Sequence, residues 1–195
     1  MEQIRACRLC ADDFARTKTA HRPRPVPWFR SSARLLIAGQ APGLRVHESG
    51  VPFDDRSGDR LRDWLGLTRD QFYDKDMVAV VPMAFCFPGY NDSGSDLPPP
   101  PRCAATWRRA VMQRLPNLTT TVVIGRYAQH WHLGDNARKA GVTATVENWR
   151  DHAPETFAIP HPSWRNNAFL RRNPWFEAEL LPALRHRIRS VVEGA

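Results

Sequence analysis

The chain has 195 residues, enough for one domain whose hydrophobic core needs no disulfide bonds. Its formal net charge of +8 comes mainly from arginine, and this favours a polyanionic partner because the planar guanidinium group matches phosphate. No stretch approaches the roughly 18 apolar residues of a membrane span, and the amino terminus lacks the apolar core of a signal peptide. We therefore expect one cytoplasmic domain, residues 1–195, without a membrane segment.

Short apolar runs alternate with helical patterns along the chain. Residues 2–15 predict a short helix, and the prolines of residues 21–28 predict an extended segment. A proline-rich irregular stretch fills residues 82–103, and the last predicted helix begins near Pro174. The alternation predicts an α/β fold, a three-layer sandwich with a central, mostly parallel four-stranded sheet flanked by helices. The predicted strands are residues 34–38, 77–81, 121–125 and 157–160. Helices are predicted from residue 57, up to residue 73, over 103–115, through 127–131 and around 146–149.

The first predicted strand ends in a glycine-rich turn, residues 39–43 with the sequence GQAPG. Two glycines and a proline allow a tight turn whose backbone approaches a ligand closely. In a parallel sheet the carboxyl ends of the strands form the usual ligand site. A turn of this kind is also found in ordinary strand-to-helix connections, so the motif alone leaves both interpretations open.

A second motif, residues 161–166 with the sequence HPSWRN, follows the last predicted strand. Together, GQAPG, the segment GVPFDD at residues 50–55, and HPSWRN resemble the ordered signature motifs of the uracil-DNA glycosylase superfamily. The resemblance covers nearly the whole chain. It implies an α/β glycosylase fold and a monomeric DNA repair enzyme. Such an enzyme hydrolyses the N-glycosidic bond of uracil in DNA and leaves an abasic site.

Four cysteines predict a metal centre. Cys7 and Cys10 have the C-x-x-C spacing that aims two sulfurs at one metal site, and Cys86 and Cys103 flank the irregular stretch. This arrangement resembles the iron-sulfur branch of the superfamily, often called its fourth family, and implies a [4Fe-4S] cluster held by all four thiolates. Structural zinc on the same thiolates is the main alternative, and unliganded buried cysteines remain a third.

The resemblance also assigns substrate contacts. Phe53 is expected to stack on uracil, with core packing as the alternative role. His161 is expected to donate a hydrogen bond to uracil O2 as negative charge develops there. Backbone N–H groups of the first motif are expected to contact the base, and the substrate-binding set is therefore Gly39, Gln40, Ala41, Pro42, Gly43 and Phe53.

The loop after His161 is expected to contact DNA. In relatives it enters the minor groove and fills the gap left by the flipped nucleotide. Trp164 has the size and shape of that wedge, and nearby arginines are suited to phosphates. A buried tryptophan and solvated arginines are the alternative. The candidate DNA-binding residues are Ser163, Trp164, Arg165, Asn166, Arg171 and Arg172.

This chain departs from the family pattern at two points, so the residues that recognise the base and the residue that activates the water stay undecided. Ala41 stands where the best-known branch has a water-positioning aspartate, and residues 80–83 lack the asparagine that many relatives use to read uracil. The polar loop offers His47, Glu48, Asp54 and Asp55 for the water role, with Asp54 or Asp55 preferred because they adjoin Phe53. Two other functions stay open: a related glycosylase for hypoxanthine, xanthine or mismatched thymine, and a catalytically weak, metal-stabilised protein that binds nucleic acid.

Overall fold

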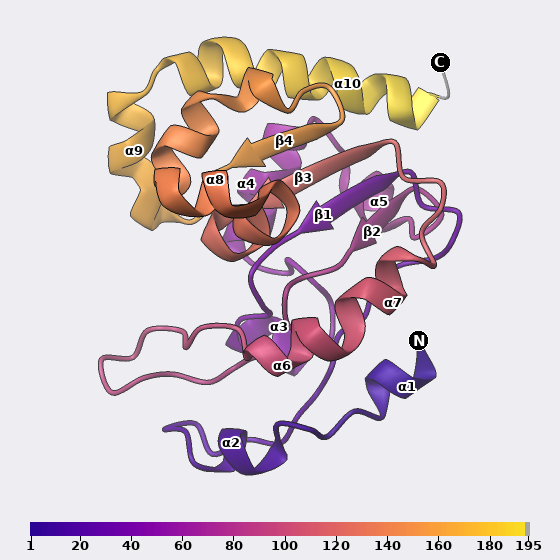
Figure 1. The fold of residues 1–195 in the computed structure, drawn as a ribbon, viewed down its shortest axis with the longest axis vertical. Helices are drawn as coiled ribbons and strands as arrows, with labels where there is room; N and C mark the ends of the chain where they lie inside the picture. Colours follow the sequence, from indigo (N-terminus) through magenta and orange to yellow (C-terminus); the bar gives the residue numbers. More distant parts are fainter. Residues whose placement is uncertain (194–195) are drawn as a thin grey trace.

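The protein is built on a four-stranded sheet in which all strands run parallel, as a computed structural model of the chain describes it for residues 1–193. The strand order is β2-β1-β3-β4, and helices cover both faces (Figure 1). The predicted α/β fold with a central four-stranded sheet is therefore confirmed. The strands are β1 (Leu35–Ala38), β2 (Val78–Val80), β3 (Thr120–Ile124) and β4 (Thr156–Ile159).

The strands are short apolar runs because both of their faces are covered. Every residue of β1 and β2 is buried, and so is most of β3 and β4. The register aligns Leu36 of β1 with Ala79 on one side and with Thr121 on the other. Strands buried on both faces read as continuous hydrophobic runs, as seen here, rather than as an alternating pattern.

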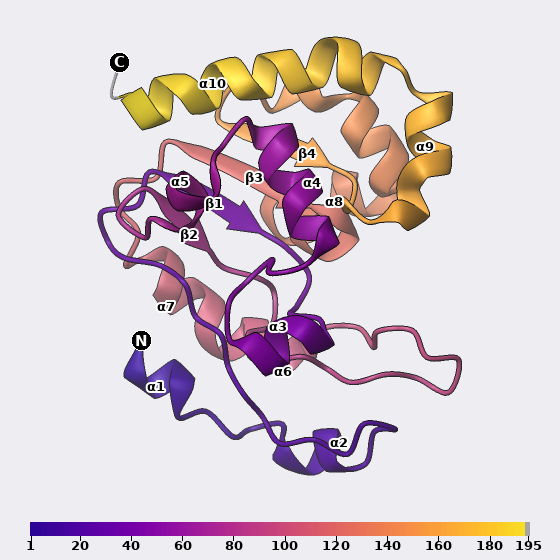
Figure 2. The same ribbon diagram turned by 180° about the vertical axis from the view of Figure 1, so that it is seen from behind.

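Helices form the two outer layers. Helices α4 (Arg56–Leu65) and α10 (Leu181–Glu193) pack together on the face seen in Figure 2, and α8 (Gly125–Glu147) packs on β3 and β4 from the opposite face. The apolar residues Leu61, Trp64 and Leu65 of α4 are all buried. The other helices are α1 (Glu2–Arg5), α2 (Ala11–Ala15), α3 (Leu44–Ser49), α5 (Arg69–Tyr73), α6 (Pro101–Cys103), α7 (Arg109–Met112) and α9 (Asn167–Arg172), and a π-helical segment, Ala104–Arg108, joins α6 to α7.

The extended segment predicted at residues 21–28 lies along the free edge of β2. The backbone N–H of Val80 donates to the Trp28 carbonyl at 2.7 Å, and the N–H of Val26 donates to the Phe85 carbonyl at 2.8 Å. Trp28 and Val80 form an antiparallel bridge. The segment therefore closes the edge of the sheet next to β2.

Two local predictions need correction. Residues 2–15 form two short helices, because the chain turns at Cys7–Cys10 between α1 and α2. The polar loop after the first motif contains α3, which starts after Gly43 and ends at Gly50 in a left-handed conformation. Helix α9, which directly follows HPSWRN, was not predicted. Short helices of this kind depend on tertiary contacts and give little periodicity in the sequence.

No helix within residues 1–193 has the length and apolar character needed to cross a membrane.

Candidate active site

A cavity of about 510 Å³ opens at the carboxyl ends of the central strands. β1 and β3 are neighbours in the sheet, and the chain leaves β1 toward β2 on one side and leaves β3 toward β4 on the other. Such switch points form the usual ligand crevice of parallel α/β sheets. The cavity brings together the three predicted motifs, the last of which follows the second by more than a hundred residues. Its walls include the predicted residues Gly39, Gln40, Ala41, Pro42, Gly43, Phe53, Asp55, His161, Ser163, Trp164 and Arg165.

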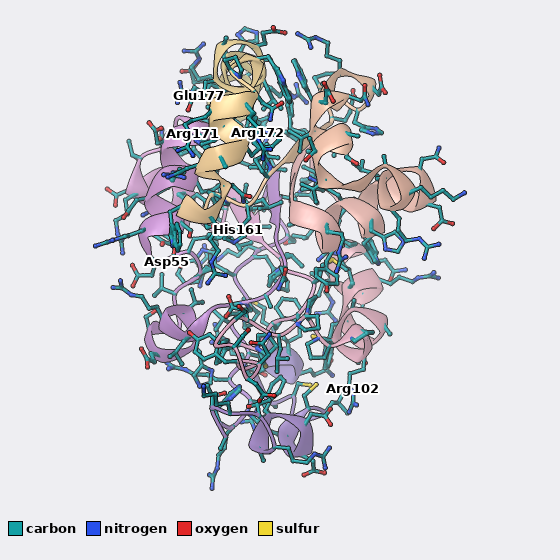
Figure 3. All side chains as sticks on the ribbon, turned by 90° about the vertical axis from the view of Figure 1, so that its left-hand side faces the viewer. Asp55, Arg102, His161, Arg171, Arg172 and Glu177 are labelled. Carbon is teal, nitrogen blue, oxygen red and sulfur yellow. The ribbon has the colours of Figure 1, made fainter. Side chains whose placement is uncertain are left out.

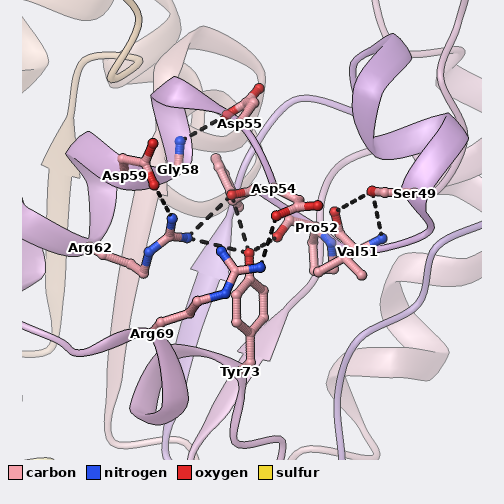
Figure 4. A network of polar contacts seen from close by, with 11 residues as sticks. Ser49, Val51, Pro52, Asp54, Asp55, Gly58, Asp59, Arg62, Arg69 and Tyr73 are labelled. Carbon is pink, nitrogen blue, oxygen red and sulfur yellow. Dashed lines mark hydrogen bonds and ion pairs between the residues drawn. The ribbon is translucent and has the colours of Figure 1, made fainter.

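Phe53 is held in an unusual backbone conformation beside the first motif. Its φ of 54° lies in the left-handed region, which a bulky residue rarely adopts. The Arg62 guanidinium donates to the Phe53 carbonyl at 3.2 Å, and the Tyr73 hydroxyl lies 2.9 Å from the Pro52 carbonyl and 3.2 Å from that of Phe53 (Figure 4). The end of the Phe53 ring would lie 3.6 Å from a Cβ built on Gly39. These contacts fix the ring over the turn at the end of β1.

Gly58 permits this arrangement because the first turn of α4 lies directly against the Phe53 backbone. A Cβ at this position would lie 1.7 Å from the Phe53 carbonyl oxygen. The N–H of Gly58 donates to the carboxylate of Asp55 at 2.8 Å, so Asp55 caps α4 while it lines the cavity. Glycine thus allows helix and loop to meet, and the cap sets the carboxylate at the cavity wall.

The loop that carries His161 is anchored from several directions. The Asn166 amide donates to the His161 carbonyl at 2.7 Å, and Arg60 donates to the Asn167 side chain at 2.8 Å and to the Ser163 carbonyl at 3.3 Å. Below the loop, the buried amide of Gln129 donates to the Ile159 carbonyl at the end of β4. The position of His161 is therefore fixed by contacts from α4, α8 and α9.

His161 lines the open cavity, where the residue is exposed to solvent but its imidazole is partly desolvated by the protein around it. This partial desolvation lowers the pKa of His161; the carboxylate of Asp55 acts in the opposite direction, and Arg165 lowers it further. Figure 3 labels Asp55 and His161 at about mid-height of the molecule, and both line the cavity. At neutral pH the imidazole is uncharged, and it has an N–H to donate to a ligand in the cavity.

The irregular stretch supplies a wall that the motifs did not predict. Residues 88–97 fold into a small hairpin with an antiparallel bridge between Tyr90 and Asp96, and the Leu97 N–H donates to the Gly89 carbonyl at 2.9 Å. Tyr90 and Asp96 both line the cavity. Desolvation raises the pKa of Asp96, Arg165 lowers it and Asp55 raises it further; all three residues line the cavity. In the sequence, this hairpin was indicated only by turn-forming residues between Cys86 and Cys103.

Three of the four candidates for water activation lie outside the cavity lining: Asp54, His47 and Glu48, the last of which is exposed. The carboxylate of Asp54 pairs with Arg69 at 2.9 Å on the outer side of the loop (Figure 4). His47 packs edge-to-face against His21, with ring centroids 5.1 Å apart, and burial lowers its pKa. Of the predicted acid-base residues, the cavity therefore contains His161 and Asp55.

The side of the molecule around the cavity mouth carries the predicted DNA-binding residues. Trp164 is 73% exposed at the cavity wall, and the Arg165 guanidinium lies 5.9 Å from the centre of its ring. Arg171 and Arg172, in the last turn of α9, are exposed beyond His161 (Figure 3). Asn166 is an exception within this set, because its amide is used inside the loop.

The four cysteines line a second, small apolar cavity near Arg102, far from His161 in Figure 3. Burial and then the charges of the other three cysteines raise the pKa of Cys86 to about 12. Backbone N–H groups of Arg24 and Phe85 point at Cys86 and Cys103 and favour their thiolates. Across residues 1–193, no three histidine, cysteine or acidic side chains are arranged to hold a metal ion as they stand. The donor set nevertheless fits a thiolate-bound metal group, since the four sulfurs share one apolar space.

The family assignment agrees with this geometry. The model of the Uracil DNA glycosylase superfamily matches residues 26–185, which include the sheet, the cavity and both motif loops. The match covers most of the chain. The chain therefore belongs to the uracil DNA glycosylase superfamily and is a DNA glycosylase.

Proposed function

We propose that this glycosylase excises uracil from DNA by hydrolysis of the N-glycosidic bond and leaves an abasic site. The observation that carries the proposal is the fixed Phe53 ring, which shares one cavity with the neutral imidazole of His161. A flat ring supports a base by stacking, and a positioned N–H stabilises negative charge on the departing base. The nucleotide has to leave the duplex to reach this cavity, as in other enzymes that act on bases.

In this proposal the residues in and around the cavity have separate roles. His161 donates to uracil O2 as the bond breaks and the base acquires negative charge. The carboxylate of Asp55, held by its cap on α4, stabilises positive charge on the sugar and orients the attacking water. Trp164 fills the space left in the duplex, and Arg165, Arg171 and Arg172 bind phosphates.

Pro82 supports a second candidate, a related glycosylase with another base preference. It lines the cavity in the region where many relatives read uracil with asparagine, and its side chain has no hydrogen-bonding group. Hypoxanthine, xanthine and thymine opposite guanine are the bases to compare.

The test is cleavage of labelled oligonucleotides that carry a single modified base, followed by alkaline scission of abasic sites. Uracil, hypoxanthine, xanthine and thymine opposite guanine are compared, each in single- and double-stranded DNA. Preferential release of uracil supports the first candidate, and preferential release of another base supports the second. Tight binding to these oligonucleotides without release of any base would contradict both candidates and favour a nucleic-acid-binding protein.

The low pKa of His161 predicts a specific response to acid. The unfolded chain binds a proton on this residue near pH 6.5, whereas the folded chain binds it only at lower pH. Between these two pKa values the unfolded state holds more protons, so the free energy of unfolding decreases as the pH falls below about 6.5. NMR titration of the imidazole should give a midpoint below 6.5, and a midpoint at or above that value would contradict the neutral donor.

For the four-cysteine centre we propose that Cys7, Cys10, Cys86 and Cys103 hold a [4Fe-4S] cluster, with zinc as the alternative. When bound, the group would join the amino-terminal turn to the two ends of the irregular stretch and so contribute to stability rather than to base release. The proposal is supported by the shared apolar cavity and the backbone N–H groups that face two of the sulfurs.

Replacing Cys86 with serine should therefore remove the metal and lower the melting temperature by about 10 °C. Visible absorbance and iron, sulfide and zinc analysis of anaerobically purified protein identify the group. Ala105→Ser, an exposed change on the helical segment after Cys103, should leave both quantities unchanged. A wild-type protein without iron or zinc would contradict the proposed centre.

A further inference from the structure

Arg108 is a buried cation without a carboxylate partner. It is 2% exposed, and it forms no ion pair with an aspartate or glutamate of residues 1–193. One guanidinium nitrogen donates to the carbonyls of Val81 and Pro82 at 2.8 and 3.0 Å, and the other donates to His132. Its Nε has no partner among the described residues. An uncompensated charge inside a protein is strongly unfavourable, so the arrangement calls for a nearby anion.

His132 does not provide that anion. Burial and then the charge of Arg108 lower the pKa of His132 to about 3, so the imidazole is neutral and its Nε2 accepts the hydrogen bond from Arg108. Trp131 provides the second contact, with its ring centre 4.7 Å from the guanidinium carbon. An aromatic face attracts a cation but does not neutralise it.

The position of Arg108 points to the cysteines. The residue follows Cys103 on the π-helical segment and directly follows Trp107, which lines the cysteine cavity. Burial lowers the pKa of Arg108 to about 10, and the one charge that acts in the opposite direction is that of Cys103. Four thiolates carry a net double negative charge when they hold either zinc or an oxidised [4Fe-4S] cluster. Thiolate-bound metal would therefore supply the missing negative charge.

The other contacts of Arg108 lead to the cavity that contains Phe53 and His161, here called the base cavity. Pro82, whose carbonyl accepts from Arg108, lines that cavity, and Cys86 lies four residues further along the same segment. Between them, the N–H groups of Met83 and Ala84 donate to the carbonyls of Gly39 and Gln40 in the first motif. One guanidinium thus contacts the segment that joins the two cavities.

We propose that Arg108 is the internal counter-ion of the four-cysteine centre and the positioning residue that transmits its presence to Pro82 in the wall of the base cavity. Its charge stabilises the bound thiolates, and one of its guanidinium nitrogens holds the carbonyls of Val81 and Pro82. The inference rests on the proposed metal centre, and it does not depend on which base is released or on which metal is bound.

The test compares Arg108→Met, Arg108→Lys and Arg109→Met with the wild-type protein, all purified anaerobically. Arg109→Met is the matched control, because it removes the same positive charge from the neighbouring, exposed position. We expect Arg108→Met to release its metal to a chelator about 10- to 100-fold faster than wild type, as for loss of an outer partner of a metal site. Arg108→Lys, which keeps the charge, should stay near wild type, as should Arg109→Met.

Hydrogen exchange of peptides that cover residues 79–86 tests the positioning role. Exchange should accelerate in Arg108→Met, because methionine has no donor for the two carbonyls, and it should stay unchanged in Arg109→Met. Metal release that is unchanged in Arg108→Met, or equally fast in Arg108→Met and Arg108→Lys, would overturn the counter-ion role. Absence of any metal from active wild-type enzyme would overturn it too, while base release would still support the proposed function.

Discussion

Replacing His161 with alanine is expected to lower the rate of base release from uracil-containing DNA by about 100- to 1,000-fold, as for removal of one donor to a developing anion. The loop that carries this residue is anchored by Asn166, Arg60 and Gln129, so the substitution removes the imidazole without freeing the backbone. DNA affinity should change little, because the candidate phosphate and wedge contacts come from other residues. Single-turnover cleavage and equilibrium binding to the same oligonucleotide measure the two effects separately.

A matched control is available in the same chain. His186 is exposed on α10, away from the cavity, so His186→Ala should keep the parent rate. If His161→Ala cleaves as fast as the parent protein, or loses affinity and rate in equal measure, the imidazole is not the donor that the proposed mechanism requires.

Replacing Gly58 with alanine is expected to destabilise the protein by about 2–3 kcal/mol, equivalent to roughly 5–10 °C in melting temperature. The new Cβ would lie 1.7 Å from the Phe53 carbonyl oxygen, so α4 and the Phe53 loop would have to separate. Separation would weaken the Asp55 cap and the contacts from Arg62 and Tyr73. Thermal unfolding gives the stability change, and base release should fall as the ring of Phe53 loses its fixed position.

Gly43→Ala serves as the stability control. Gly43 has a φ of −82°, and no atom lies within 4 Å of a Cβ built there, so alanine fits without strain. Its melting temperature should therefore stay close to that of the parent protein. Equal melting temperatures for Gly58→Ala and Gly43→Ala would mean that the loop yields freely and that Phe53 is not held as described.

The fold could be predicted because its strands carry a strong local signal. Four apolar runs separated by helices leave few arrangements other than a parallel α/β sheet. Helix α3 was missed because its six residues, Leu44–Ser49, contain a single buried side chain, at Val46. A helix that short is specified by its surroundings rather than by its own periodicity.

The residues of the candidate site also fall into those that the sequence predicted and those that it did not. The motif residues were found because each lies next to the end of a strand, and parallel strands bring those ends together. The hairpin wall with Tyr90 and Asp96 was missed, since its place over the cavity depends on distant contacts. The left-handed Phe53 also gave no signal of its own, and only the glycine at position 58 in the first turn of α4 hinted at it. Asp54 and Asp55 are neighbours in sequence, yet one faces Arg69 and the other faces the cavity.

The extended segment at the edge of β2 has a consequence for association between molecules. Residues of an extended strand present their backbone groups alternately to either side, and Val26 and Trp28 use theirs toward the sheet side. The alternate positions are Pro23, Pro25 and Pro27, which are buried and have no N–H to donate. An incoming strand would find neither an open border nor N–H donors there, so this covered, proline-rich segment protects the protein against edge-to-edge aggregation.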